Sequence, residues 1–176
     1  MYLTGRKLMV VAHPDDETLW GAGIILRNPG GWNVVACSTP VSDPVRAEKF
    51  MEACSRLWAV GTVLPCPDQY GTPLALDVAL DADVIVTHGL AGEYGHPHHQ
   101  QVARYVRDHA QCPVISFGYL TGARRLLLNE QESLGKLHAL RAYDHVLPYN
   151  GRPMTKWEAL LERYGEAWLD CETYDP

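Results

Sequence analysis

The sequence KLMVVAHPDDE spans residues 7–17 and joins a short apolar run to five residues that are charged, polar or turn-forming. Apolar side chains follow one another without alternation in Lys7–Ala12, which predicts a strand that is buried on both faces. The next segment, Asp16–Arg27, carries its apolar residues at helical spacing. A buried strand that leads directly into a helix predicts the start of a βαβ unit.

The same alternation continues along the chain, with turn-forming residues such as Asn28-Pro29-Gly30-Gly31 between the segments. Further strands are predicted at Trp32–Ser38, Val60–Cys66, Asp83–Thr87 and Val114–Phe117. Further helices are predicted at Pro44–Trp58, Leu74–Leu80, Pro97–Ala110, Glu130–Tyr143 and Thr155–Tyr164. Right-handed crossovers then favour a single α/β domain over residues 1–176, a Rossmann-like three-layer α/β/α sandwich with a mostly parallel sheet.

Composition excludes several classes of protein. The chain of 176 residues is 47% hydrophobic and 20% charged, which argues against intrinsic disorder. Its 15 basic and 21 acidic residues give a net charge of −6, which argues against nucleic acid as a partner. The five cysteines are widely spaced, and we expect neither a disulfide framework nor a thiolate zinc site. With no apolar run long enough for a membrane span, we expect a soluble cytoplasmic protein.

Polar chemistry collects after the first and fourth predicted strands, in residues 13–17 and 92–99. In the strand order 3-2-1-4-5 of doubly wound sheets, these two strands are neighbours where the winding reverses, and ligands bind beyond their carboxyl ends. Four histidines and two adjacent aspartates are therefore expected to lie close together. Imidazole and carboxylate groups are typical ligands of a transition metal.

Helical spacing selects the ligands from these segments. Asp16 shares a helix face with apolar residues of its helix, and His99 does the same in the later helix, so both are expected to face the sheet. His13, at the tip of the first strand, supplies a third ligand. Two nitrogens and one oxygen with an open position predict one catalytic Zn²⁺ per chain. Asp15, rotated about 100° from Asp16 around the helix start, is then placed to act as general base.

These residues resemble a known family. Ala12–Glu17 together with Gly95–His99 is similar to the PIG-L / LmbE-like N-acetylglucosaminyl deacetylases, which are metal-dependent amidases. Two weaker stretches, Arg46–Leu57 and Lys136–Tyr143, resemble an Arg/Glu helix and a late Lys-x-x-Ala-Leu-x-x-Tyr helix of the same family. The resemblance covers most of residues 7–145.

The resemblance implies the same three zinc ligands and the same general base as the spacing does. It adds His96 as the group that stabilises the oxyanion and protonates the leaving amine, and Tyr94 as a second support for the oxyanion. It also places Arg46 where it can touch substrate. The implied reaction is zinc-dependent hydrolysis of the N-acetyl group of a GlcNAc-containing small molecule.

The chain departs from the family at two places. His98 stands where the family usually has Asp, and changes beside metal ligands can alter affinity by about 10–100-fold. Residues 38–43 replace the usual Gly-rich loop, and the chain is shorter than typical members. The resemblance therefore does not extend to the surface that recognises the sugar. We therefore expect an altered metal affinity or pH optimum.

Several readings stay open. A metal-dependent amidase for another acylated small molecule or a modified nucleoside is one alternative, and a nucleotide-binding module is another, although no G-x-G-x-x-G follows the first strand. An oligomer is compatible with the sequence. Asp15 and Asp16 also fit helix caps, and His98 fits a solvated surface position as well as a site position. The tryptophans at helical spacing are expected in the core: Trp20, Trp58, Trp157 and Trp168.

Overall fold

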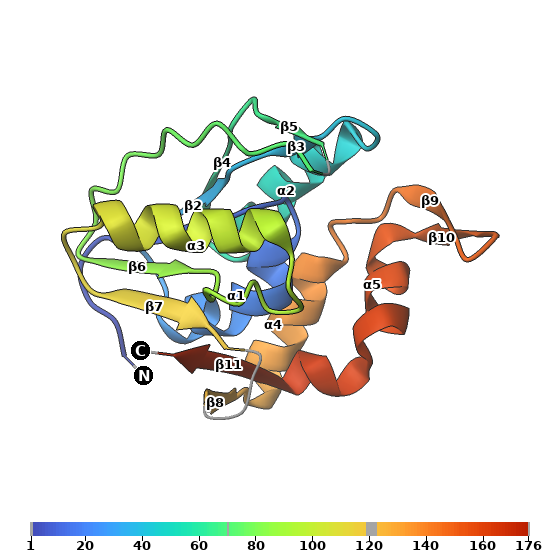
Figure 1. Cartoon of the computed structure of the whole chain (residues 1–176). Helices are drawn as coiled ribbons and strands as arrows, with labels where there is room; N and C mark the ends of the chain where they lie inside the picture. Colours follow the sequence, from blue (N-terminus) through green and yellow to red (C-terminus); the bar gives the residue numbers. More distant parts are fainter. Residues whose placement is uncertain (1, 70, 119–122, 176) are drawn as a thin grey trace.

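A seven-stranded sheet lies between two layers in the computed structural model, which describes residues 2–69, 71–118 and 123–175 (Figure 1). The strand order is β4-β2-β1-β6-β7-β11-β8. The strands are β1 (Lys7–Val11), β2 (Trp32–Ala36), β4 (Val60–Val63), β6 (Val84–Thr87), β7 (Val114–Phe117), β8 (Arg124–Leu127) and β11 (Cys171–Asp175). The first five in this order pair in parallel, whereas β11 is antiparallel to both of its neighbours. The predicted order 3-2-1-4-5 and the α/β class are confirmed.

Strand β1 is buried on both faces and divides the core in two. Met9 and Val11 belong to a cluster on the face that packs against α1 (Asp16–Arg27), α2 (Val45–Arg56) and α4 (Glu130–Leu140). Leu8 and Val10 point to the opposite face, toward α3 (Pro97–His109). In Figure 1, α3 lies across the near face of the sheet, and α1 and α4 lie behind it. The absence of alternation in the sequence thus reports a central strand of a sandwich.

The helix predicted at Leu74–Leu80 is wrong: these residues have no regular secondary structure. Leu74 and Val78 are buried, as the apolar spacing indicated, but they reach the core from an irregular segment beside α3. Side chains of α3 form hydrogen bonds with the backbone of this irregular segment. Gln101 bonds both the amide and the carbonyl of Leu74, and the Tyr105 hydroxyl does the same for Val78. Backbone groups satisfied by side chains do not need a helix.

Other differences lie at element ends and near the C-terminus. Beyond β2 and β4 the chain forms a separate short parallel pair, β3 (Thr39–Pro40) and β5 (Pro67–Asp68), rather than longer strands. The strands β8 and β11 were not predicted, nor was the hairpin of β9 (Val146–Tyr149) and β10 (Arg152–Thr155). This hairpin and α5 (Lys156–Tyr164) extend from one side of the sheet in Figure 1, and the short helix Glu166–Asp170 leads back to β11.

The core position predicted for Trp58 is also wrong. Helix α2 ends at Arg56, earlier than predicted, and Trp58 follows it with a φ of 60° and 81% of its surface exposed. Leu57, only 1% exposed, takes the buried position instead. The helical spacing that suggested burial does not continue past the end of the helix.

A buried acid at the start of α4 provides a test of the packing between α1 and α4. Glu132 completes a capping box with Asn129 and accepts a 2.7 Å hydrogen bond from Arg27 Nε. These contacts, Arg27 first, lower the pKa of Glu132. We expect Glu132→Gln to lower the free energy of unfolding by about 1–2 kcal/mol at neutral pH. Because the carboxylate stabilises the fold above its unfolded pKa, of about 4.3, the difference should shrink as the pH falls through the folded value.

Urea unfolding at pH 7 and pH 3 measures this difference. Glu130→Gln is the matched control, since Glu130 is an exposed acid of the same helical turn. A Glu132→Gln deficit that is equally large at both pH values would contradict the assignment.

Within the described part of the chain, none of the helices has the length and apolar character needed to span a membrane.

Candidate active site

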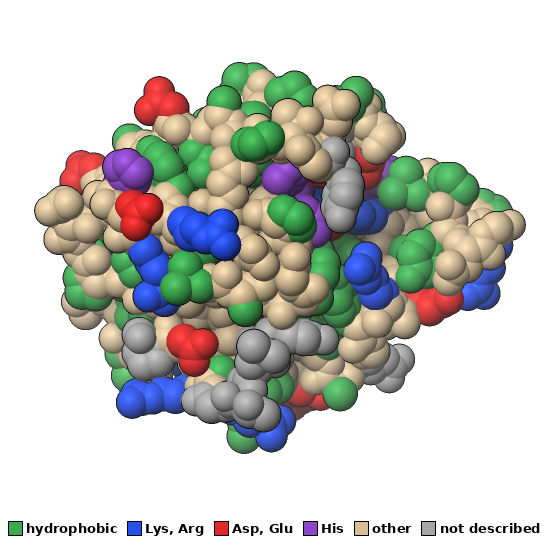
Figure 2. Space-filling model, viewed as in Figure 1, with side chains coloured by type: hydrophobic (Ala, Val, Ile, Leu, Met, Phe, Trp, Pro, Cys, Tyr) green, Lys and Arg blue, Asp and Glu red, His purple; other side chains and the backbone are tan. Residues whose placement is uncertain are grey.

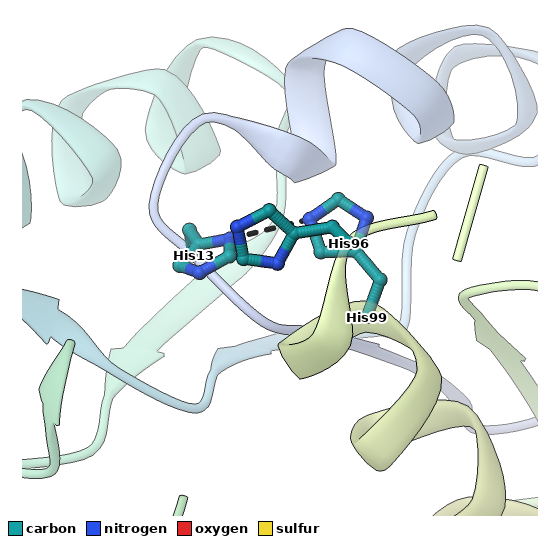
Figure 3. A group of neighbouring side chains, drawn as sticks. All are labelled: His13, His96 and His99. Atoms are coloured by element: carbon teal, nitrogen blue, oxygen red, sulfur yellow. Dashed lines mark hydrogen bonds between the residues drawn. The ribbon is translucent and has the colours of Figure 1, made fainter. Parts of the chain in front are cut away.

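The two polar segments singled out in the sequence meet at the carboxyl ends of neighbouring strands. Strand β1 leads through His13 into α1, and β6, its hydrogen-bonded neighbour, leads through His88 and the loop of residues 89–96 into α3. The N-termini of α1 and α3 therefore lie side by side. Figure 3 shows the rings of His13, His96 and His99 turned toward one another, the last two from the start of α3.

The three residues predicted to bind metal form a compact triangle. Nδ1 of His13 lies 3.2 Å from Oδ2 of Asp16 and 3.3 Å from Nε2 of His99, and the Asp16 and His99 atoms are 3.4 Å apart. All three side chains are buried. Burial opposes the ionisation of Asp16, but His99 and His13 outweigh it and hold the pKa of this carboxyl well below its usual range.

The donor atoms of this triangle suit a zinc ion. His99 Nδ1 lies 2.5 Å from Oε2 of Glu93, a carboxylate that accepts, so the proton sits on Nδ1 and the lone pair of Nε2 faces Asp16 and His13. A carboxylate oxygen and two imidazole nitrogens thus converge on one point, where a cation can bind to all three. Ligands of a tetrahedral zinc at 2.0–2.1 Å are about 3.3 Å apart, which agrees with the observed distances.

Glu93 aligns two imidazole rings at once. Its Oε2 accepts from Nδ1 of His99 and from Nδ1 of His88 at 2.9 Å, and its Oε1 accepts from the amide of Gly89 at 2.9 Å. Burial alone would raise the pKa of Glu93, but His88 and His99 outweigh it and lower the pKa to about 2. The ring of His88 stacks on that of His99 and accepts a hydrogen bond from the amide of Ala12. The residue that follows β1 is thereby connected to Glu93 through His88. The sequence interpretation missed Glu93, although it lies in the same 92–99 segment.

Replacement of Glu93 by Gln should weaken zinc binding about 10–100-fold, because metal-bound histidines depend on the acceptor behind them. Competition with a chromophoric chelator measures the dissociation constant. Glu48→Gln, an exposed acid of α2, serves as the control. Unchanged zinc affinity in the Glu93 variant would show that the carboxylate does not align His99.

Asp15 is held in a strained conformation directly before α1. Its φ is 111°, a region that L residues rarely adopt, and it is not part of the helix, so the expected rotation around the helix start does not describe its position. Its carboxylate makes no helix cap. Instead, Oδ1 contacts Nη2 of Arg46 at 2.5 Å and Oδ2 contacts Nζ of Lys156 at 3.3 Å. Strain of this kind persists where the surroundings impose it, commonly at functional sites.

His96 and Tyr94 line the same cavity as Asp15. A ring nitrogen of His96 lies within 4.8 Å of the corresponding atoms of His13 and His99. Burial first, then the neighbouring rings of His99 and His13, lower the pKa of His96 to about 4. Its Nδ1 is buried and has no hydrogen-bond partner among the described residues. Tyr94 is 42% exposed, and its ring centroid is 5.8 Å from that of His96.

The cavity has a volume of about 180 Å³ and is strongly polar. Arg46, predicted to touch substrate, lines it while pairing with Asp15. Helix α5 contributes Lys156, Arg163 and Tyr164, and the end of β5 contributes Asp68. Figure 2 shows histidine side chains in a recess beside the arm that carries α5. The sequence analysis did not predict a role for Asp68, Lys156, Arg163 or Tyr164, because the sequence around these residues contains no motif.

His98 is not a solvated surface residue. It is 3% exposed, and its Nε2 donates to the carbonyl of Thr72 at 2.9 Å. Its Nδ1 lies 3.3 Å from Nε2 of His13 and 3.2 Å from Oδ1 of Asp68. The residue that departs from the family pattern therefore contacts a predicted zinc ligand.

Comparison with known proteins identifies the fold. A deacetylase of the teicoplanin biosynthesis pathway superposes with a TM-score of 0.65 at 13% identity, covering 96% of both chains. The N,N'-diacetylchitobiose deacetylase from Pyrococcus horikoshii superposes with a TM-score of 0.60 at 16% identity, covering 97% of this chain and 83% of that one. These structural neighbours are LmbE/PIG-L deacetylases, and the predicted resemblance is confirmed for the fold.

The same fold also carries a different reaction. The 4-carboxy-2-hydroxymuconate hydratase from Pseudomonas putida superposes with a TM-score of 0.61 at 16% identity, over 97% of this chain and 95% of the hydratase. Likeness at such identities shows the fold alone, and function has to be argued from the site.

No family model matches the sequence. The uncharacterized protein L374 of Acanthamoeba polyphaga mimivirus is 27% identical over 139 residues, which cover 64% of this chain. The match spans 61% of the viral protein.

Proposed function

We propose that this chain, as a single LmbE-like deacetylase domain over residues 1–176, is a zinc-dependent hydrolase that removes the N-acetyl group from a GlcNAc-containing small molecule. The observation that carries the proposal is the triangle of donor atoms from His13, Asp16 and His99, with edges of 3.2–3.4 Å, beside a cavity that Asp15 and His96 also line. Deacetylases with the same fold support the reaction class.

The three residues would hold one zinc ion and leave a coordination position open toward the cavity. When bound, zinc supplies Lewis acidity, which lowers the pKa of water in that position and polarises an amide carbonyl.

Asp15 is the proposed general base. Its carboxylate is buried, lines the cavity and is fixed by Arg46 on one oxygen and Lys156 on the other. Contacts with two cations keep the side chain in one orientation. A carboxylate so placed can accept the proton of the attacking water.

His96 and Tyr94 are proposed to act on the other end of the reacting amide. An N–H of His96 and the Tyr94 hydroxyl can donate to the carbonyl oxygen as negative charge develops on it. Burial raises the pKa of Tyr94 above its ordinary value, so the phenol keeps its proton and remains a donor. The proton that Asp15 takes from water is the one that the leaving amine needs. The neutral ring of His96, which lines the same cavity, can accept this proton from Asp15 and pass it to the amine.

The cavity limits the substrate to a small polar group. A volume of about 180 Å³ and a lining of Arg46, Lys156, Arg163 and three acids suit an acetamido group and part of a sugar ring. Hydroxyl groups of a sugar can pair with this mixture of cations and carboxylates. We propose that Arg46, whose guanidinium pairs with Asp15, contacts the part of the substrate that enters the cavity.

The decisive experiment combines metal analysis with an amine-release assay. Purified protein should hold one tightly bound zinc per chain and release a free amine from N-acetylglucosamine derivatives. Asp16→Ala and His99→Ala should each lose that zinc and the activity together. Zinc that stays bound in both variants would refute the ligand assignment, and a metal-loaded protein without amine release on any sugar would refute the substrate.

Two other substrates deserve a place in the assay. The likeness to the teicoplanin-pathway deacetylase supports, as a second candidate substrate, an acylated small molecule other than a simple sugar. The likeness to the hydratase supports, as a third candidate, a reaction that adds water to a carbon–carbon double bond. An acylated glycopeptide and an unsaturated tricarboxylate of the carboxymuconate type therefore belong in the panel. Amine release distinguishes the first, and loss of ultraviolet absorbance without amine release distinguishes the second.

A further inference from the structure

His13 contacts a second group of metal-binding atoms with the ring nitrogen that the candidate zinc site does not use. Its Nδ1 faces Asp16 and His99, whereas its Nε2 lies 3.3 Å from Nδ1 of His98 and 3.6 Å from Oδ2 of Asp68. The third edge, from His98 Nδ1 to Asp68 Oδ1, is 3.2 Å. Asp68 thus contacts the two rings through different oxygens, and one ligand atom from each of His13, Asp68 and His98 lies within 4.8 Å of the other two, which makes a second triangle of metal-binding groups.

Hydrogen-bond chemistry leaves this second triangle short of protons. The carbonyl of Thr72 can only accept, so Nε2 of His98 carries the proton and, in the neutral ring, Nδ1 carries a lone pair. That lone pair faces a carboxylate, which is also an acceptor. A proton on His13 Nε2 can satisfy His98 at 3.3 Å, but Asp68 at 3.6 Å is beyond a normal hydrogen bond. A cation at the centre satisfies all three groups.

The surroundings also suit an ion rather than a structural polar cluster. Among the described residues, the basic groups within ion-pair distance of the Asp68 carboxylate are these two imidazole rings. Its side chain is 20% exposed and lines the cavity, so an ion can enter from solvent. The carbonyl of Thr72 fixes the His98 ring from behind, and the backbone amide of His13 donates to Oδ2 of Asp16 at 2.8 Å, which holds His13 in place beside the first site. Two nitrogens and one oxygen form a ligand set of the type that binds zinc with an open position.

We propose that His13, Asp68 and His98 form a second divalent-metal site of the zinc class, with the imidazole of His13 bridging it to the first site. Binding of the second ion releases the Nε2 proton of His13 to solvent, so the ring bridges as an imidazolate and both ring nitrogens ligate. The inference rests on the proposed zinc site because the two sites share His13. It assigns to His98, where the family usually has Asp, the role of an additional ligand.

Metal stoichiometry tests the proposal on the full chain. Protein stripped with a chelator is reloaded with zinc, separated from free metal by gel filtration and measured by inductively coupled plasma mass spectrometry. We expect about two zinc ions per wild-type chain and about one in Asp68→Asn and in His98→Gln, which keep hydrogen-bonding groups but remove ligands. His109→Gln should retain two, because His109 is an exposed histidine of the same helix. A Co²⁺ titration followed by visible absorption should show two steps in the wild type and one in each site variant.

The outcomes separate this site from the first. One zinc in the wild type that Asp16→Ala removes would overturn the second site and leave the proposed function intact. Two zincs that survive both Asp68→Asn and His98→Gln would also overturn it. No tightly bound zinc in any form would refute the proposed function itself. Circular dichroism of each variant shows whether a lost ion reflects a lost ligand or a lost fold.

Discussion

Replacing Asp15 by Asn is expected to lower kcat by about 10²–10⁴-fold while zinc content stays at the wild-type level. General bases contribute to rates by this amount. Asp15 belongs neither to the triangle of His13, Asp16 and His99 nor to that of His13, Asp68 and His98, so its amide variant should keep the ligands in place. Amine release under substrate saturation, with zinc measured on the same sample, checks both parts.

The structure makes this substitution conservative in shape but not in charge. Asn at position 15 keeps an oxygen for Arg46 Nη2, which now lies 2.5 Å from the carboxylate, but cannot accept a proton from water. Arg46 and Lys156 would then lose their counter-charge, so some change in KM is expected as well. The loss in kcat is the part that reports the base.

Asp43→Asn is the matched control. Asp43 is also buried and precedes a helix, but it pairs with His145 rather than with a residue of the cavity. Its variant should keep nearly full turnover. Unchanged turnover in Asp15→Asn would refute the base assignment, and loss of zinc in that variant would move Asp15 from base to ligand.

Replacing Lys136 by Met is expected to lower the free energy of unfolding by about 3–5 kcal/mol, the usual cost of leaving one partner of a buried ion pair alone. Nζ of Lys136 lies 2.8 Å from Oε1 of Glu172, and both side chains are almost completely buried. Met preserves the length and apolar stem of Lys but leaves the Glu172 carboxylate without its cation. Urea unfolding measures the change.

This ion pair packs against the middle of α1 and bonds to its backbone. Lys136 donates to the carbonyl of Leu19, and Glu172 accepts from the amides of Gly23 and Ile24. A Cβ at Gly23 would lie 2.8 Å from Oε2 of Glu172, so the close approach requires glycine there. The pair therefore connects α4 and β11 to the helix that begins with Asp16.

Two further variants define this effect. Adding Glu172→Gln to Lys136→Met should recover part of the loss, because Gln removes the uncompensated charge and still accepts from the α1 amides. Arg152→Ala breaks an exposed pair with Glu162 and should change stability by less than about 1 kcal/mol. A Lys136→Met variant as stable as Arg152→Ala would show that the buried pair contributes nothing to the fold.

The late helix that resembles the family pattern also acquires a physical meaning. Lys136 contacts the middle of α1, and the Tyr143 hydroxyl donates at 2.7 Å to Oε1 of Glu17 in its first turn. Burial raises the pKa of Glu17 to about 7, opposed by the hydrogen bonds from Thr18 and Tyr143. These residues hold in place the helix that presents Asp16. The sequence pattern indicated the helix, but not what its polar residues touch.

Local pattern was enough for the central part of the fold. Unbroken apolar runs predicted β1, β6 and β7, and the handedness of crossovers predicted that β1 and β6 are neighbours. From that, the meeting of His13, Asp16 and His99 followed, and the structure brings these three side chains together. The prediction failed at Leu74–Leu80, where apolar spacing reported burial and not a helix.

Periodicity within short segments was enough to identify the central strands. The right-handed winding of successive βαβ units then placed the polar ends of β1 and β6, and with them His13, Asp16 and His99, at one edge of the sheet. Three contacts could be seen only in the folded chain: Glu93 aligns His99, Arg46 and Lys156 hold Asp15, and Asp68 lies against His98 beside His13. These contacts join residues from separate elements whose local sequence carries no trace of the partner. Their distances depend on how the helices, strands and loops pack, and packing is a property of the whole chain.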